Sequence, residues 1–200
     1  MKPICLLFLI SICSFSCKKT VFNYTTSGKI IDANTGLGIP NSKVRLDRFK
    51  GELLGSTSMA FVDSTITDAD GEYKFKLKHE RGWQYEVRAQ ADNYFFDNSN
   101  DYVSSSRHAD IKLLPQATLE FDVRNTKGGA GVYFTTLNTR IIQKTDETGQ
   151  GTFQKYPCIV EGNKLISIYY YIYEKTGNKT KYDTTIYCPS FQTTTFRIDY

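Results

Sequence analysis

The chain has 200 residues, with 25 Lys and Arg against 21 Asp and Glu, a formal net charge of +4, and 14% aromatic residues. The basic residues are scattered, and without a dense basic stripe the charge does not favour nucleic acid as a partner. Thr, Tyr, Val and Ile are abundant, which favours strands, and no segment combines a helical apolar period with caps. The composition therefore predicts an all-β protein.

The first twenty residues have the pattern of an export signal. Lys2 gives a basic start, residues 4–12 are an almost unbroken apolar run, and Ser14-Phe15-Ser16-Cys17 follows. The run is too short for a permanent membrane-spanning helix, and small residues occupy two of the three positions before the cysteine. The segment resembles a bacterial lipoprotein signal. The resemblance implies that residues 1–16 are removed, that Cys17 is acylated (with palmitate, for example), and that residues 17–23 form a lipidated tether.

The residues after Cys17 bear on where the anchored protein resides. Lipoproteins displayed on the surface of some bacteria carry acidic residues there, whereas this chain has Lys18 and Lys19. By that resemblance we expect an outer-membrane lipoprotein of the cell envelope that faces the periplasm. The two lysines either contact anionic headgroups, at about 1 kcal/mol each, or serve as a plain solubilising linker.

Two cysteines remain in the mature chain, because Cys5 and Cys13 leave with the signal and the lipid takes Cys17. In an oxidising compartment Cys158 and Cys188 are expected to form a disulfide, which would close a loop of about 30 residues. The alternative is a pair of free thiols with a redox or metal role. The absence of a Cys-x-x-Cys motif and of a nearby His disfavours it.

The first half of the mature chain reads as strands separated by turns. Alternation and turn residues predict strands at residues 24–31, 42–49, 60–67, 73–78, 83–91 and 109–114, with Pro115 as a boundary. Asp68-Ala69-Asp70-Gly71 is predicted to be a hairpin turn, since Asp-Gly supplies the positive φ angles that a hairpin needs.

Several short motifs in this half resemble the carboxypeptidase regulatory-like domain. They are Ser27-Gly28-Lys29-Ile30-Ile31-Asp32, Thr35-Gly36, Ile39-Pro40-Asn41-Ser42-Lys43-Val44, Thr67-Asp68-Ala69-Asp70-Gly71-Glu72-Tyr73-Lys74-Phe75 and Ala91-Asp92-Asn93-Tyr94. Ile30, Ser42 and Asn93 depart from the family pattern. The resemblance implies a transthyretin-like β-sandwich over residues 24–115 and says almost nothing about function.

The second half repeats part of this pattern. Thr, Asp, Gly and Phe of residues 67–75 recur at one constant offset in residues 145–153, which predicts a second β-sandwich over residues 116–200. A sheet extension that is not a true repeat is the alternative. Residues 165–174 and 180–188 are expected to pair around a turn at 175–179, and residues 193–199 to form the last strand.

Catalytic patterns are missing from the sequence. The only histidines are His79 and His108, and no His-Glu-x-x-His or Gly-x-Ser-x-Gly motif is present. We therefore expect no enzyme, no catalytic residues and no cofactor. Asp68, Asp70 and Glu72, with Asp63 nearby, superficially resemble part of a calcium loop. The position that should carry a bidentate Glu holds His79, which favours a simple turn and no metal.

Aromatic residues give the strongest functional hint. If Tyr170 and Ile172 point inward, then Tyr169, Tyr171 and Tyr173 form an outward row that suits ligand binding by sugar stacking or protein contact. A second cluster is expected near one end of the first domain, formed by Trp83, Tyr94, Phe95, Phe96 and Tyr102. The alternative is that both sets belong to cores or to packing between domains.

These observations predict a non-enzymatic envelope lipoprotein with two tandem small antiparallel β-sandwich domains. It would be bound to the membrane by lipid and would serve as a structural or protein-interaction module for another envelope protein. The alternative function is glycan binding through the tyrosine row.

Overall fold

The computed structural model describes residues 22–51, 57–80, 82–95, 101–103, 108–128, 130–136, 143–146 and 153–200. The predicted signal and Cys17 lie outside these ranges. The described strands are β1 (Phe22–Asp32), β2 (Lys43–Gly51), β3 (Thr57–Ile66), β4 (Glu72–His79), β5 (Gln84–Gln90), β6 (Asp101–Val103), β7 (Ile111–Leu113), β8 (Gln116–Arg124), β9 (Gly131–Thr136), β10 (Gln143–Asp146), β11 (Phe153–Glu161), β12 (Lys164–Tyr173), β13 (Lys179–Cys188) and β14 (Thr193–Asp199). Within the described ranges no helix could cross a membrane. The predicted all-β class is confirmed.

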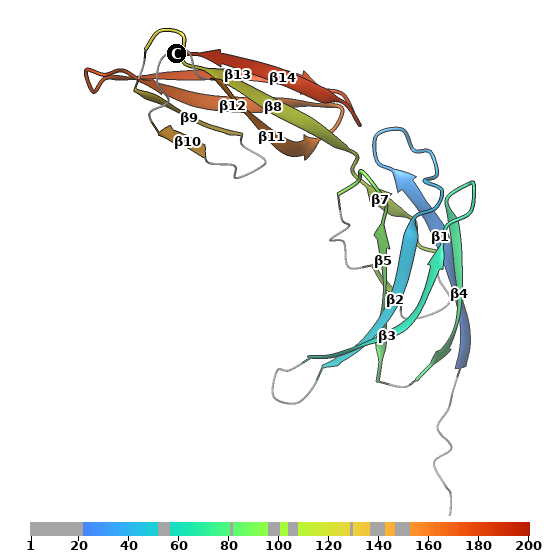
Figure 1. Ribbon diagram of the computed structural model, residues 1–200. Coiled ribbons are helices and arrows are strands. Elements are labelled where there is room, and N and C mark those ends of the chain that lie inside the picture. The colour runs from blue at the N-terminus through green and yellow to red at the C-terminus, as the bar shows by residue number, and fades with distance from the viewer. Residues whose placement is uncertain are drawn as a thin grey trace, which may run out of the picture.

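The strands build two sandwiches that follow one another along the chain (Figure 1). The first packs a sheet of order β4-β1-β7 against one of order β3-β2-β5-β6, and the second packs β11-β8-β14 against β10-β9-β12-β13. The two sandwiches therefore have the same strand order: adding seven to each strand number of the first sandwich gives the strand at the same position in the second. This confirms the predicted tandem of sandwiches, and the alternative of a sheet extension is wrong. Neighbouring strands are antiparallel except for β1 with β7 and β8 with β14, which are parallel.

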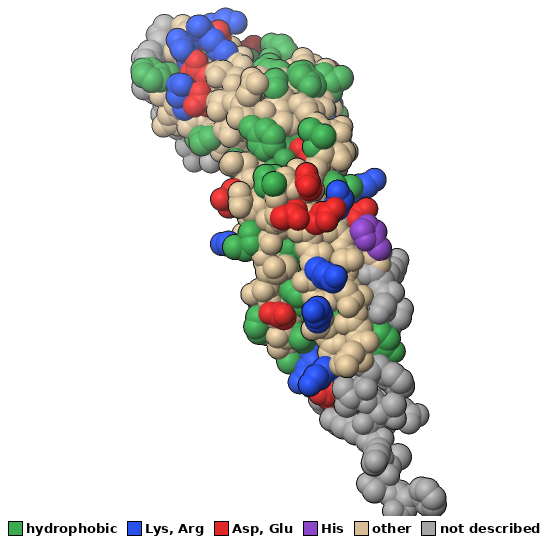
Figure 2. All heavy atoms as spheres, turned by 90° about the vertical axis from the view of Figure 1, so that its right-hand side faces the viewer, with side chains coloured by type: hydrophobic (Ala, Val, Ile, Leu, Met, Phe, Trp, Pro, Cys, Tyr) green, Lys and Arg blue, Asp and Glu red, His purple; other side chains and the backbone are tan. Residues whose placement is uncertain are grey.

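Strand alternation gives each sandwich a core of its own. In β4, Tyr73, Phe75 and Leu77 are buried, and the lysines between them are exposed on the outer face. Figure 2 shows a column of basic side chains on the lower sandwich, with acidic side chains gathered toward its upper end. The first core centres on residues such as Ile30, Leu46 and Val87, and the second on residues such as Leu119, Phe121, Phe134 and Ile168.

Two local predictions need correction. The predicted tether ends early, because β1 begins at Phe22, which pairs with His79, and Asn23 pairs with Lys78. The turn at 68–71 is present, with Gly71 at φ 77°, but it is not a hairpin. It connects β3 to β4, which lie in opposite sheets, because a tight turn fixes a reversal of direction and not the partner of the strand that follows it.

The two sandwiches are joined without a loop. β7 ends at Leu113 and β8 begins at Gln116, and the connection is hydrogen-bonded to both sandwiches. The Gln116 N–H donates to the carbonyl of Asn93 at 2.8 Å, while the N–H of Gly162 donates to the carbonyl of Pro115 at 2.8 Å.

Side chains add to this joint. Asn34 of the first sandwich donates through Nδ2 to the carbonyl of Gly162 in the second at 3.2 Å. The rings of Tyr94 and Phe191 meet edge to face, with centroids 5.4 Å apart, and the Tyr94 hydroxyl donates to Asp32 at 2.9 Å. We call this connection, with the contacts that cross it, the joint. Backbone hydrogen bonds, a side-chain hydrogen bond and an aromatic contact hold the two sandwiches together there.

Candidate functional site

The outer face of the larger sheet in the first sandwich carries a groove of about 710 Å³. It is lined by side chains from β2, β3 and β5, and the pairing register sets them in three rows. Each row runs across the strands and consists of residues paired in the register. The first row holds Ile66 and Lys43, the second holds Ser64, Arg45 and Arg88, and the third holds Phe61, Asp47 and Glu86. Cationic and apolar groups therefore share one concave surface.

The carboxylates of this face are buried, whereas its cations reach the surface. Arg45 Nε lies 2.8 Å from Asp47 Oδ1, and the Arg88 guanidinium lies 2.9 Å from Glu86 Oε2. The exposed fractions of the side chains are 1% for Asp47 and 4% for Glu86, against 56% for Arg45 and 33% for Arg88. Because Lys43 is also exposed, the surface presents positive charge outward.

A β-bulge brings an aromatic ring to this face. The register shifts between Leu46, which faces Asp63, and Asp47, which faces Phe61. Phe61 thereby lies in the row of the buried carboxylates, 57% exposed, and the Arg45 guanidinium lies 5.3 Å from its ring centroid. The bulge therefore places an exposed apolar group directly beside Arg45.

Sequence reasoning missed this groove. The alternation of Lys43, Arg45 and Asp47 with buried Val44 and Leu46 does place the charged residues on the outer face. Nothing in the alternation indicates that a carboxylate on that face is buried, because the burial depends on cross-strand neighbours that only the register reveals.

The predicted tyrosine row lies on the outer face of β12, as expected. Tyr170 and Ile172 pack against the second core, so Tyr169, Tyr171 and Tyr173 point the other way. All three are half-buried. Lys181 lies over the ring of Tyr169 and Lys179 over that of Tyr171, each 5.5 Å from the centroid. The rings of Tyr133 and Tyr171 are tilted against each other at 5.9 Å.

Trp83 and Tyr94, two described members of the second predicted aromatic cluster, lie apart. Trp83 precedes β5 and stacks under Arg48, 4.4 Å from its ring centroid, whereas Tyr94 follows the other end of β5 at the joint. A seven-residue strand separates them, so sequence proximity in this segment does not mean contact. The side chains of Phe96 and Tyr102 lie outside the described part of the chain.

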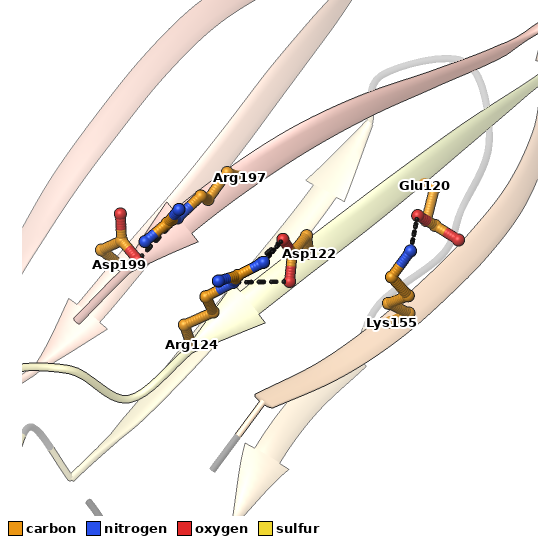
Figure 3. Close-up of polar contacts among 6 residues, drawn as sticks. All are labelled: Glu120, Asp122, Arg124, Lys155, Arg197 and Asp199. Atoms are coloured by element: carbon orange, nitrogen blue, oxygen red, sulfur yellow. Dashed lines mark hydrogen bonds and ion pairs between the residues drawn. The ribbon is translucent and has the colours of Figure 1, made fainter. Parts of the chain in front are cut away.

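The outer face of β11-β8-β14 carries a ladder of ion pairs (Figure 3). Arg124 binds both carboxylate oxygens of Asp122, and its shortest contact is 2.7 Å. Lys155 lies 2.7 Å from Glu120, and Arg197 lies 2.9 Å from Asp199. The hydrogen bond from Arg124 holds the pKa of the Asp122 carboxyl below its ordinary value. Three cations meet three carboxylates, so the ladder leaves no net charge for a ligand.

The acidic turn at 68–71 is held by its own carboxylate. Asp68 Oδ1 accepts the N–H groups of Asp70 at 3.0 Å and Glu72 at 2.8 Å, and Glu72 pairs with Lys29 at 3.0 Å. His108 lies on the surface, 3.0 Å from Asp110. In the described residues no three His, Cys, Asp or Glu side chains are grouped so as to hold a metal ion.

Cys158 and Cys188 are free, buried thiols that belong to the second core. They come from strands of opposite sheets, β11 and β13. The thiol of Cys158 donates to the carbonyl of Leu119 at 3.2 Å. Burial, reinforced by Cys188, raises the pKa of Cys158 to about 11, and burial also raises the pKa of Cys188. The predicted disulfide is thus not formed in this structure, and the pairing stays a prediction.

Comparison with known proteins identifies no family. No family model and no curated protein matches the chain. Among solved structures, the TIE protein of Bacillus anthracis superposes with a TM-score of 0.39 at 15% identity, covering 88% of this chain and 34% of that one. A streptococcal ancillary pilin gives 0.39 at 12% identity, covering 88% and 62%. The shaft pilin SpaA of Lactobacillus rhamnosus GG gives 0.35 at 9% identity, covering 90% and 98%.

This chain therefore spans about a third of the length of the TIE protein. The fold class follows from the strand order of the two sandwiches. No family model matches the first half, whose motifs resemble the carboxypeptidase regulatory-like domain.

Proposed function

We propose that this chain is a non-enzymatic protein of the bacterial cell envelope, held in the outer membrane by a lipid on Cys17. Its two sandwiches would act as a spacer of fixed length that presents an interaction surface to another envelope protein. The observation that carries the proposal is the closed joint, in which Pro115 and Gln116 are hydrogen-bonded to residues of both sandwiches.

The arrangement of the chain suits a spacer. Only residues 18–21 separate Cys17 from β1, and the five extended Cα–Cα steps from Cys17 to Phe22 reach at most about 18 Å. The first sandwich would therefore lie close to the membrane. β1 begins at the lower end of that sandwich and the second sandwich lies at its other end (Figure 1), so the second sandwich would be held away from the membrane.

Crosslinking in the native envelope tests this proposal. The full lipidated protein is crosslinked, captured and analysed by mass spectrometry, with a Cys17→Ala variant as the control. We expect one envelope protein in stoichiometric amount with the wild type, and release of the Cys17→Ala variant from the membrane fraction. Retention of that variant in the membrane would refute the lipid anchor, and the absence of any protein partner would refute the interaction role.

Glycan binding through the tyrosine row is the alternative, supported by the shared outward direction of Tyr169, Tyr171 and Tyr173. Against it, Lys181 and Lys179 already lie over two of these rings. Polysaccharide binding that is lost when the three tyrosines are replaced by Ala would favour the glycan, and unchanged binding would remove this alternative.

A further inference from the structure

The larger sheet of the first sandwich has an unpaired edge beside the groove. β3 is ten residues long, and in the part of the chain that the structure describes it pairs with β2 alone. Met59, Phe61 and Ile66 on its outer face are 52%, 57% and 61% exposed. Exposed edges with apolar side chains are places where another strand can add.

We propose that β3 receives an extended segment of a partner protein as an added strand, with an acidic side chain between two apolar ones at alternate positions. The inference rests on the proposed interaction role and names the surface and the chemistry of the partner.

The register of the sheet dictates this pattern. Side chains of an added strand that point to the groove would continue the three rows across β3. Ile66 and Phe61 offer apolar contacts to two of them. Ser64, between these two, is short and exposed, so a carboxylate in the middle row would pass over it to Arg45 and Arg88, which pair across the strands.

Charge complementarity favours a carboxylate at this place. Asp47 and Glu86 are buried under the arginines they pair with, whereas Lys43 and Arg45 are exposed and Arg88 is half-buried. Among the described side chains of this outer face, three cations stand beside two carboxylates, a net charge of +1.

A second copy of this chain fits the edge less well. The outer face of β3 offers Met59, Phe61, Ser64 and Ile66, and none of these is acidic. Pairing β3 with itself would bring no carboxylate to Arg45. The favoured occupant is therefore a different chain.

The Asp63 side chain occupies a backbone N–H group of β3. Its Oδ1 accepts the N–H of Ser64 at 2.8 Å, and an added strand that bonds to this amide must displace it. Asp63 is exposed, so its side chain is free to rotate into solvent. Removal of this carboxylate should strengthen binding.

The test uses the full-length protein in detergent and a short synthetic peptide with Val, Glu and Val at alternate positions and Thr between them. Binding is followed by amide chemical shifts and by hydrogen exchange of the β3 amides. We expect the peptide to bind and to protect these amides, and a Gln-for-Glu peptide to bind about tenfold more weakly, as the loss of one charge-assisted hydrogen bond implies.

Variants at Ser64 test the effect of an added carboxylate beside Arg45 without changing the residues of the ion pairs Arg45–Asp47 and Arg88–Glu86. Ser64→Glu would place a carboxylate on Arg45 and abolish peptide binding, whereas Ser64→Gln has the same size without the charge and should bind more tightly than Ser64→Glu. Asp63→Ala should bind more tightly than the wild type. Thr184→Glu, on the exposed edge strand β13, serves as the control and should change nothing.

Several results would overturn the inference. These are equal binding of a Lys-for-Glu peptide, no protection of β3, equal effects of Ser64→Glu and Ser64→Gln, or protection of β3 by self-association without peptide. The proposed function is tested separately, because an envelope partner whose crosslinks map away from β3 would remove this inference and leave the function standing.

Discussion

At the residue scale, Gly71 illustrates how one position fixes the connection between two sheets. It has φ 77°, and a Cβ there would lie 2.7 Å from both the carbonyl oxygen of Ile30 and the amide nitrogen of Ile39. The Ile30 N–H donates to the carbonyl of Gly71 at 2.8 Å, so the backbone cannot retreat without losing a bond. Gly71 is therefore required both for its backbone conformation and for its lack of a side chain.

We predict that Gly71→Ala lowers the free energy of unfolding by more than about 2 kcal/mol, because strain at positive φ adds to a backbone clash. Gly36→Ala is the matched control, since Gly36 has φ 73° but a Cβ there would meet nothing within 4 Å. It should cost only the conformational strain of about 1 kcal/mol. Equal losses in urea denaturation would contradict the role of the clash.

The Asp122 carboxylate predicts a dependence of stability on pH. Its hydrogen bonds from Arg124 lower its pKa in the folded protein, so the folded pKa lies below the unfolded value of about 3.9. The stabilisation is then present above the unfolded pKa and is lost as the pH falls through the folded pKa.

The stability advantage of the wild type over Asp122→Asn should be constant at neutral pH and shrink as the pH falls below about 4. Denaturant midpoints of both proteins over this range measure it. A difference that stays constant down to the lowest pH would show that the carboxylate charge does not contribute.

The burial of an individual charged side chain is difficult to predict from sequence. The outward direction of Asp47 follows from alternation, and so does that of Tyr169, Tyr171 and Tyr173. The burial of Asp47 and Glu86 does not follow, because it arises from a bulge and from cross-strand pairs between β2, β3 and β5. For this reason the sequence alone does not predict the groove that we consider the best candidate site.

At the element scale, the hairpin of β12 and β13 was predicted correctly, because two long alternating segments flank a turn with Gly and Asn. The turn at 68–71 has equally clear sequence signals, but its strands separate into two sheets. Turn chemistry alone does not tell a hairpin from a crossing between sheets. The repeat of strand order, in contrast, was signalled by the shared spacing of Thr, Asp, Gly and Phe.

The cysteines of β11 and β13 provide a test of how the two sheets are held together. If Cys158 and Cys188 pair in the exported protein, reduction should lower the free energy of unfolding by about 3–4 kcal/mol, the amount expected for a closed loop of about 30 residues. Thiol titration of the unfolded protein, with and without reductant, counts the free thiols. Two free thiols without reductant would refute the pairing.

For the whole molecule, the contacts at the joint determine whether the two sandwiches keep a fixed relative orientation. A Cβ on Gly162 would lie 2.6 Å from Ser190 Oγ and 2.7 Å from Ser190 Cα, so Gly162 packs directly against Ser190 with no room for a side chain. The Gly162 N–H bonds to Pro115 and its carbonyl accepts from Asn34. This residue therefore joins the second sandwich to the first.

We predict that Gly162→Val opens the joint and leaves the first sandwich folded, because the added side chain clashes with Ser190 and forces a shift of the Gly162 backbone, whose N–H and carbonyl make the bonds to Pro115 and Asn34. Small-angle scattering should report a broader range of shapes for the variant than for the wild type. Asn178→Val, in the exposed turn between β12 and β13, is the control and should scatter like the wild type. An unchanged profile for Gly162→Val would contradict this role of the joint.

Residual dipolar couplings of the backbone amides would show whether the two sandwiches form one rigid spacer. We predict that a single alignment tensor fits the couplings of residues 22–113 and 116–200 together, with the relative orientation of the structure. Separate tensors of different magnitude for the two sandwiches would show independent motion and contradict the account.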